Sequence, residues 1–152
     1  MMMQHLSPAE EHALNQMQLS LNTDFTAILL LSKTDGKLHV IFHIGSRSKR
    51  TGKLSFKTNE GIAEPVFKSG RVFSASFNTS HAAPLFHSCP LLLAERLTSI
   101  ISVPLFQSQS LIGLLLTGTR YHSRTFHHNE IQHVQKEASN LSSSMPTIPI
   151  VI

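Results

Sequence analysis

Ten histidines and a single cysteine are the side chains in this 152-residue chain that could bind a metal or react with an oxidant. His81, His87 and Cys89 lie in one short segment, yet a zinc site needs further cysteines or carboxylates at characteristic spacings. His128 and His133 are five residues apart, so on a helix they point in different directions, unlike a pair at i and i+4. The spacing favours surface or packing histidines, and it leaves a metal site and a proton-sensing role as alternatives.

Covalent and redox catalysis would need partners that the sequence does not supply. Cys89 has no second cysteine that could resolve an oxidised thiol or form a disulfide. Ser102, Asp24 and the histidines show no spacing typical of a hydrolase, and no phosphate-binding loop or dinucleotide fingerprint occurs. The sequence therefore predicts a protein that is not an enzyme and that needs no cofactor and no metal.

One stretch of the chain is basic and contains no acidic residue. Its cationic residues are Arg47, Lys49, Arg50, Lys53 and Lys57, in a protein whose formal net charge is +4. The favoured interpretation is a solvated loop and edge strand, and the alternative is a rim that attracts an anion or an acidic partner. Few aromatic residues interleave with these charges, so we expect no nucleic-acid partner.

Length and composition fit one soluble domain. A chain with 41% hydrophobic and 14% charged residues has enough apolar material for a core. Its longest apolar runs, 27–31 and 111–116, are much shorter than the roughly 18 residues that span a bilayer, and the N-terminus lacks the regions of a signal peptide. We therefore expect a cytoplasmic protein with no membrane partner.

The N-terminal part predicts a helix and then a hairpin. Ser7, followed by a proline and then by Glu10, is a helix-start signal, and the helix extends to about Leu21. An apolar run at 25–32 and an alternating run at 38–44 predict two strands, joined by a turn that contains the favoured Asp-Gly pair.

The rest of the chain predicts short elements and a final helix. They are a short edge strand at 53–57, a helix between Gly61 and Gly70, a strand at 72–77, an irregular loop at 78–90, a helix at 91–97, strands at 100–106 and 111–119, and a helix from Asn129. Apolar stripes on the two terminal helices are more typical of core than of an interface. The order predicts an α+β sandwich, with one domain at 1–143 and a tail at 144–152.

Three stretches in this order resemble GAF domains: 61–71, 97–105, and 111–116 with Phe126 and Glu130 after it. The segments 90–99 and 113–126, together with the basic loop 45–50, resemble a subgroup. These are the stand-alone GAF nitrate receptors that accompany bacterial nitrate- and oxygen-responsive sensor kinases. The resemblance implies a GAF-like antiparallel sheet with the N- and C-terminal helices on one face. A ligand pocket then lies under short helices and loops on the other face.

In that pocket a small anion, with nitrate the best candidate, would meet the backbone N–H groups of Ile62 and Ala63. A helix start does offer unpaired donors and partial positive charge, and Gly61 just before it permits close approach. The resemblance places the remaining walls at Val40, Phe42, Ser88 and Pro90.

Three positions depart from the subgroup. Val40 replaces an aromatic residue, Ser88 replaces a tyrosine, and Glu64 replaces a small residue beside the anion, where a carboxylate opposes binding unless it points to solvent. Two functions therefore stay open: an anion-sensing protein that modulates a sensor histidine kinase, or a GAF interaction or dimerisation module with a different or vestigial pocket. In the second case the terminal helices are the surface at which a homodimer would form. A redox or metal-dependent enzyme of the same fold is a third hypothesis.

Overall fold

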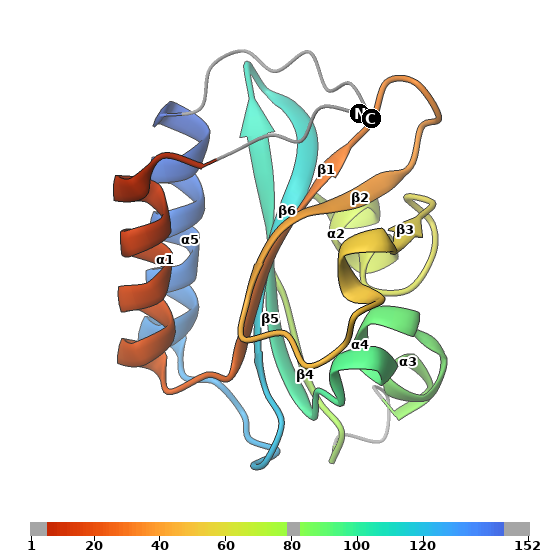
Figure 1. Cartoon of the computed structure of the whole chain (residues 1–152), viewed down its shortest axis with the longest axis vertical. Helices are drawn as coiled ribbons and strands as arrows, with labels where there is room; N and C mark the ends of the chain where they lie inside the picture. The colour runs from red at the N-terminus through yellow and green to blue at the C-terminus, as the bar shows by residue number, and fades with distance from the viewer. Residues whose placement is uncertain (1–5, 79–82, 145–152) are drawn as a thin grey trace.

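Two helices from opposite ends of the chain pack side by side on one face of an antiparallel sheet (Figure 1). The computed structural model describes residues 6–78 and 83–144. Across these residues the sheet has six strands in the order β3-β2-β1-β6-β5-β4. The strands are β1 (Phe25–Leu31), β2 (Leu38–Ile44), β3 (Ser55–Phe56), β4 (Phe73–Ser76), β5 (Ser99–Gln107) and β6 (Ser110–Thr119).

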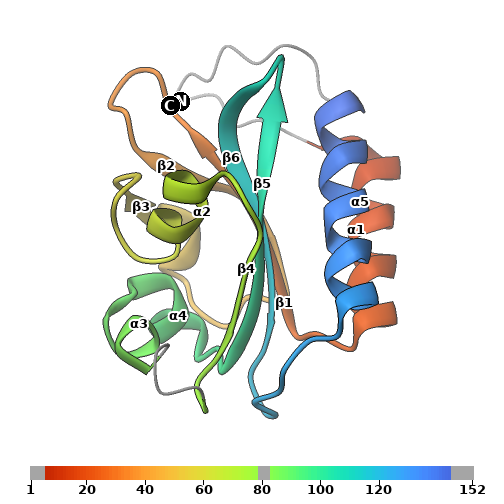
Figure 2. The same ribbon diagram turned by 180° about the vertical axis from the view of Figure 1, so that it is seen from behind.

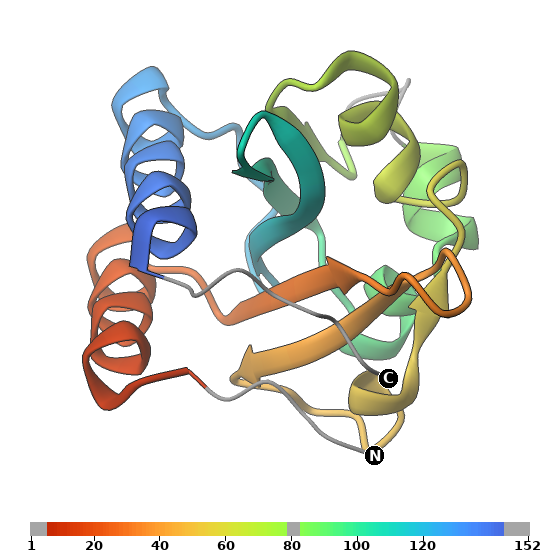
Figure 3. The ribbon, with the colours of Figure 1, turned by 90° about the horizontal axis from the view of Figure 1, so that it is seen from above.

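Short helices cover the opposite face of the sheet, as Figure 2 and the view from above in Figure 3 show. The helices are α1 (Pro8–Leu21), α2 (Ala63–Ser69), α3 (Ala83–Ser88), α4 (Pro90–Glu95) and α5 (His128–Ser144), with a 3-10 turn η1 (Thr51–Lys53). Helices α1 and α5 lie on one side of the sheet, and α2, α3 and α4 lie on the other. The predicted α+β class and the position of the terminal helices are confirmed.

Local chemistry sets the ends of the first elements. The N–H of Ser7 donates to Glu10 Oε1 at 2.8 Å and the N–H of Glu10 donates to Ser7 Oγ at 3.1 Å, which forms a capping box at the start of α1. Asn22 ends this helix in the left-handed region. Gly36, with φ of 71°, occupies the tight turn of the predicted hairpin between β1 and β2.

The sheet separates two hydrophobic cores. The stripes of α1 and α5 face the sheet in the first core, as predicted, and their buried members are Leu14, Met17, Leu21, Val134, Ala138 and Leu141. The second core, which we call the compartment, lies between the sheet and α2, α3 and α4. It includes residues from both strands and short helices, among them Leu29, Val40, Phe56, Ile62, Ala63, Val66, Cys89, Leu91, Leu92 and Leu116.

The predicted irregular loop at 78–90 is wrong over its described part, because 83–88 form helix α3. The polar composition of this segment led to the prediction of a loop, although two of its features are compatible with a helix. Pro84 lies in the first turn, where a missing N–H costs little, and Phe86 is buried in the compartment. Residues 79–82 lie outside the described part of the chain.

At the other end, α5 runs to Ser144, one residue past the predicted boundary of the domain. The rest of the predicted tail, 145–152, lies outside the described residues. Among the helices of 6–78 and 83–144, none is long and apolar enough to cross a bilayer.

Candidate functional site

The compartment brings together four of the residues that the sequence assigned to a ligand pocket. Val40 on β2 is 4% exposed, and Ile62 and Ala63 at the start of α2 are fully buried. Gly61 has φ of +54°, and a Cβ on it would lie 3.0 Å from the Sγ of Cys89. Both features favour glycine at this position, because it adopts the left-handed backbone without strain and leaves room for the buried thiol.

Phe42 lies on the other side of the sheet, so the prediction that it lines the pocket with Val40 is wrong. Ordinary alternation places residues 40 and 42 on one face of a strand. A β-bulge breaks this alternation, because Ile28 pairs with Phe42 while the next residue, Leu29, pairs with Val40. Ile41 and Phe42 consequently both pack in the core under α1 and α5.

Ser88 and Pro90 are both exposed, so neither side chain is enclosed in the compartment. The Ser88 hydroxyl donates to the Pro84 carbonyl at 2.8 Å, which keeps it on its own helix. The residue between them, Cys89, is 1% exposed and takes the inward position at the junction of α3 and α4.

The start of α2 supplies fewer free donors than the sequence suggested. The N–H of Ala63 donates to the Glu60 carbonyl at 3.0 Å, so this group is used within a turn. Ile62 is the N-cap, and its side chain makes no capping hydrogen bond. Glu64 is exposed, which removes the objection that its carboxylate would face an anion inside.

Sequence reasoning missed one polar group in the compartment, the hydroxyl of Ser102. This residue on β5 is fully buried, and its Oγ has no hydrogen-bond partner among the described residues. Its cross-strand neighbours Leu116 and Phe73 both belong to or pack against the compartment, so the Ser102 side chain faces the same way. The only signal for it was a serine within an apolar strand.

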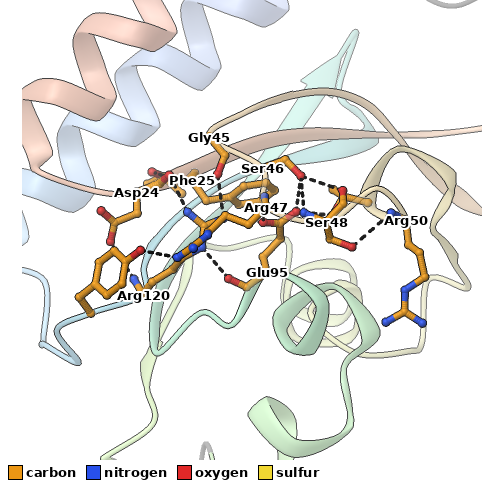
Figure 4. Close-up of polar contacts among 12 residues, drawn as sticks. Asp24, Phe25, Gly45, Ser46, Arg47, Ser48, Arg50, Glu95 and Arg120 are labelled. Atoms are coloured by element: carbon orange, nitrogen blue, oxygen red, sulfur yellow. Dashed lines mark hydrogen bonds and ion pairs between the residues drawn. The ribbon is translucent and has the colours of Figure 1, made fainter.

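A second polar constellation joins the basic loop to α4 (Figure 4). The fully buried carboxylate of Glu95 accepts hydrogen bonds from the hydroxyls of Ser46 and Thr51 and, at 2.8 Å, from the N–H of Arg47. Arg120 forms an ion pair with it. Burial raises the pKa of Glu95, but hydrogen bonds from Ser46, Thr51, Arg47 and Arg120 outweigh burial, and the pKa lies below its ordinary value.

Arg120 at the end of β6 extends this network to the backbone. It donates to the carbonyl of Glu95 at 2.7 Å, to that of Gly45 at 2.7 Å and to that of Asp24 at 3.2 Å. Its side chain is 6% exposed. The cationic side chains of the basic stretch are exposed and β3 is an edge strand, as the sequence predicted, but the loop backbone is anchored by hydrogen bonds to the buried pair of Glu95 and Arg120.

The metal alternative gains no support from the described residues, where no three His, Cys, Asp or Glu side chains gather closely enough to hold an ion. Cys89 is free and buried. His81 of the proposed loop cluster lies outside the described part of the chain, so the structure describes only His87 and Cys89 of that group.

The fold and the covered compartment define a GAF module. A family model for the GAF domain matches residues 11–145, and the chain belongs to this family. No protein of curated function matches it.

Three solved structures illustrate the likeness. An NreA protein from Staphylococcus aureus, mutated in its nitrate-binding site, has a TM-score of 0.70 and 22% identity, over 86% of this chain and 97% of that one. A domain of a two-component sensor histidine kinase protein from Sinorhizobium meliloti has a TM-score of 0.67 and 20% identity, over 90% and 88%. A free methionine-R-sulfoxide reductase from Thermoplasma acidophilum has a TM-score of 0.59 and 16% identity, over 88% and 92%. At these identities the likeness defines the fold alone.

Proposed function

We propose that this chain is a small-molecule-sensing GAF domain whose ligand binds in the compartment between the sheet and α2, α3 and α4. A small anion is the ligand class, nitrate is the best candidate, and a sensor histidine kinase is the partner that receives the signal. The observation that carries the proposal is the buried hydroxyl of Ser102, which has no hydrogen-bond partner within residues 6–78 and 83–144.

A buried hydroxyl without a partner costs about 1–3 kcal/mol, so such a group needs an explanation. A ligand with an acceptor oxygen satisfies it and recovers that free energy on binding. The cross-strand neighbours of Ser102, Phe73 and Leu116, are apolar, and hydrophobic walls with a few placed polar groups are typical of small-ligand sites. Nitrate offers acceptor oxygens and one delocalised charge, which suits donors in a dry compartment better than a strongly hydrated anion.

Helix α2 supplies the other wall. It packs over β5 and β6, and its first residues Ile62 and Ala63 are fully buried. Glycine at 61 lets the backbone come close to Cys89, so α2 begins deep in the compartment rather than at its edge. The partial positive charge of the helix start adds to the attraction for an anion.

The experiment is thermal unfolding of the full chain against nitrate, nitrite, chloride and sulfate at constant ionic strength. A ligand at 100 times its dissociation constant adds about 2.7 kcal/mol to the free energy of unfolding. We expect a saturable rise in the melting temperature with nitrate. Equal small effects of all four anions would refute an anion-sensing role.

Substitution of Ser102 tests the location of the site. Ser102→Ala removes an unsatisfied polar group, so the unliganded protein should be at least as stable as the parent while nitrate binds about 2- to 12-fold more weakly. Ser99→Ala is the matched control on the same strand. Its hydroxyl is hydrogen-bonded to that of Thr119, so this variant should lose stability and keep the nitrate response. If Ser102→Ala leaves nitrate affinity unchanged, Ser102 does not touch the ligand.

The second candidate function is an interaction or dimerisation module. Leu19 on α1 is 74% exposed, and a large apolar side chain in that position suits a helix contact between two copies. Sedimentation that depends on protein concentration, abolished in Leu19→Glu, together with no anion response would favour this alternative.

A further inference from the structure

A surface pocket of about 480 Å³ lies between the basic loop and the end of α4, and its lining is polar and charged, unlike that of the apolar compartment. Its lining residues are Arg47, Ser48, Lys49, Arg50, Ala94, Glu95 and Arg96. Four of them are cationic. We call this the basic pocket.

The single acidic residue of the lining does not cancel those charges. Glu95 is fully buried, and its carboxylate is paired with Arg120, which is outside the lining. Arg47 donates to the hydroxyl of Tyr121 and lies over its ring at 6.0 Å, an interaction that orders the guanidinium without neutralising it. The surface of the basic pocket is therefore positive.

Three further cations of the basic pocket have no counter-charge in the structure. Lys49, Arg50 and Arg96 are exposed, and across residues 6–78 and 83–144 no carboxylate lies within 4 Å of their charged groups. Figure 4 shows the guanidinium of Arg50 apart from the network around Glu95. Like charges held together around a concave surface create a local potential that attracts anions.

The loop that carries these cations is held in place before any ligand arrives. Ser46, Arg47 and Thr51 each donate a hydrogen bond to the carboxylate of Glu95, and these bonds fix the loop against α4. Within the loop, the N–H of Arg50 donates to Ser48 Oγ at 3.2 Å, and the N–H of Ser48 donates to Ser46 Oγ at 3.3 Å. A preformed site loses less conformational entropy on binding than a mobile loop does.

We propose that the basic pocket binds a phosphate-bearing small molecule. Three of its four cations are arginines, whose planar forks donate two parallel hydrogen bonds to phosphate oxygens. Its volume is in the range of small-ligand sites. Apart from Ala94 its lining has no apolar side chain, which disfavours both an apolar ligand and the hydrophobic centre of a protein interface.

The test is calorimetric titration of the full chain with pyrophosphate at constant ionic strength, with citrate and a poly-glutamate peptide as comparators. We expect saturable binding of pyrophosphate. The double variant Arg50→Gln/Arg96→Asn should weaken it at least about tenfold, since two charge-assisted forks are lost. Asparagine is chosen at 96 because that residue has φ of 55° and asparagine tolerates the left-handed region.

The control variant is Lys68→Gln/Lys136→Gln, which makes the same charge change on α2 and α5, outside the basic pocket. It should alter pyrophosphate affinity less than twofold. Equal weakening by both double variants, or no saturable binding, would overturn the proposal. Citrate or poly-glutamate binding more tightly than pyrophosphate would overturn it in favour of carboxylate or acidic-protein recognition.

A measurement on the unsubstituted protein removes dependence on folding of the variants. Amide NMR shifts on addition of pyrophosphate should be confined to residues 46–51 and to residues 90–96, which are α4 and Arg96. Shifts spread over the whole basic surface would contradict a built site.

Discussion

Replacing Glu95 should cost more stability than replacing any exposed acidic residue of the chain. Glu95→Ala leaves the guanidinium of Arg120, which is 6% exposed, without its carboxylate, and it removes the acceptor of the Thr51 hydroxyl and of the Arg47 N–H. Removing one partner of a buried ion pair costs about 3–5 kcal/mol. A domain of this kind has about 5–15 kcal/mol in total, so this variant should lose a large fraction of its free energy of unfolding.

Glu95→Gln separates charge from shape. Glutamine keeps the side-chain volume and one acceptor oxygen but loses the charge-assisted hydrogen bonds, which contribute about 1.5–3 kcal/mol. Glu64→Gln is the matched control, because Glu64 is exposed and should change stability by less than about 0.5 kcal/mol. The assay is urea unfolding at pH 7 with linear extrapolation to water.

The pKa of Glu95 also predicts how its contribution to the free energy of unfolding changes with pH. The pKa of Glu95 in the folded protein lies below its ordinary value of 4.5, so near that pH the unfolded chain binds more protons than the folded one. The stabilisation by Glu95 is fully present above the unfolded pKa and is lost as pH falls through the folded pKa. The difference between parent and Glu95→Gln should therefore shrink below about pH 4.5. A difference that is constant from pH 7 to pH 3, or a loss below about 1 kcal/mol in Glu95→Ala, would refute the reasoning.

Two further predictions concern a closely packed glycine and a helix cap. Gly113→Ala should lower the free energy of unfolding in urea by more than about 4 kcal/mol, because its Cβ would lie 2.1 Å from the Leu29 carbonyl oxygen. The control is Gly36→Ala, whose Cβ would have no atom within 4 Å, so it should lose only the roughly 1–2 kcal/mol of an alanine in the left-handed region. Equal losses in the two variants would contradict this prediction. Ser7→Ala should cost about 1 kcal/mol and lower the melting temperature by roughly 2–4 °C, because the capping bond to Glu10 is lost; an unchanged melting temperature would show that the box does not stabilise α1.

The parts of the fold that sequence reasoning predicted are those set by neighbouring residues. The Ser7–Glu10 box and the Asp-Gly turn at 35–36 both lie within four residues of the structure that they determine. Hydrophobic period then assigned the right type to both hairpins and both terminal helices. These signals depend on neighbouring residues and not on distant contacts, so they can be recognised in a single sequence.

The errors at the candidate site arise from tertiary contacts. The bulge that turns Phe42 away depends on how β2 pairs with β1, and nothing in the alternation of residues 38–44 records it. Ser88 and Cys89 are adjacent, and only the packing of α3 decides which of them is enclosed. Glu95 was a recognisable anomaly, a lone acid in a leucine-rich helix, but its partner Arg120 is 25 residues away.

The compartment and the basic pocket share one short helix, and this limits how they can act. Leu91 and Leu92 at the start of α4 are buried in the compartment, while Glu95 at its end anchors the basic loop. A helix of six residues has no internal hinge, so displacement of its first turn also displaces the carboxylate. Coupling between two sites is typically 1–3 kcal/mol, which is about what loss of one or two hydrogen bonds to Glu95 would change. Any such coupling must be reciprocal: the proposed anion in the compartment would change the affinity of the basic pocket for phosphate by the same factor as phosphate would change the affinity of the compartment for the anion.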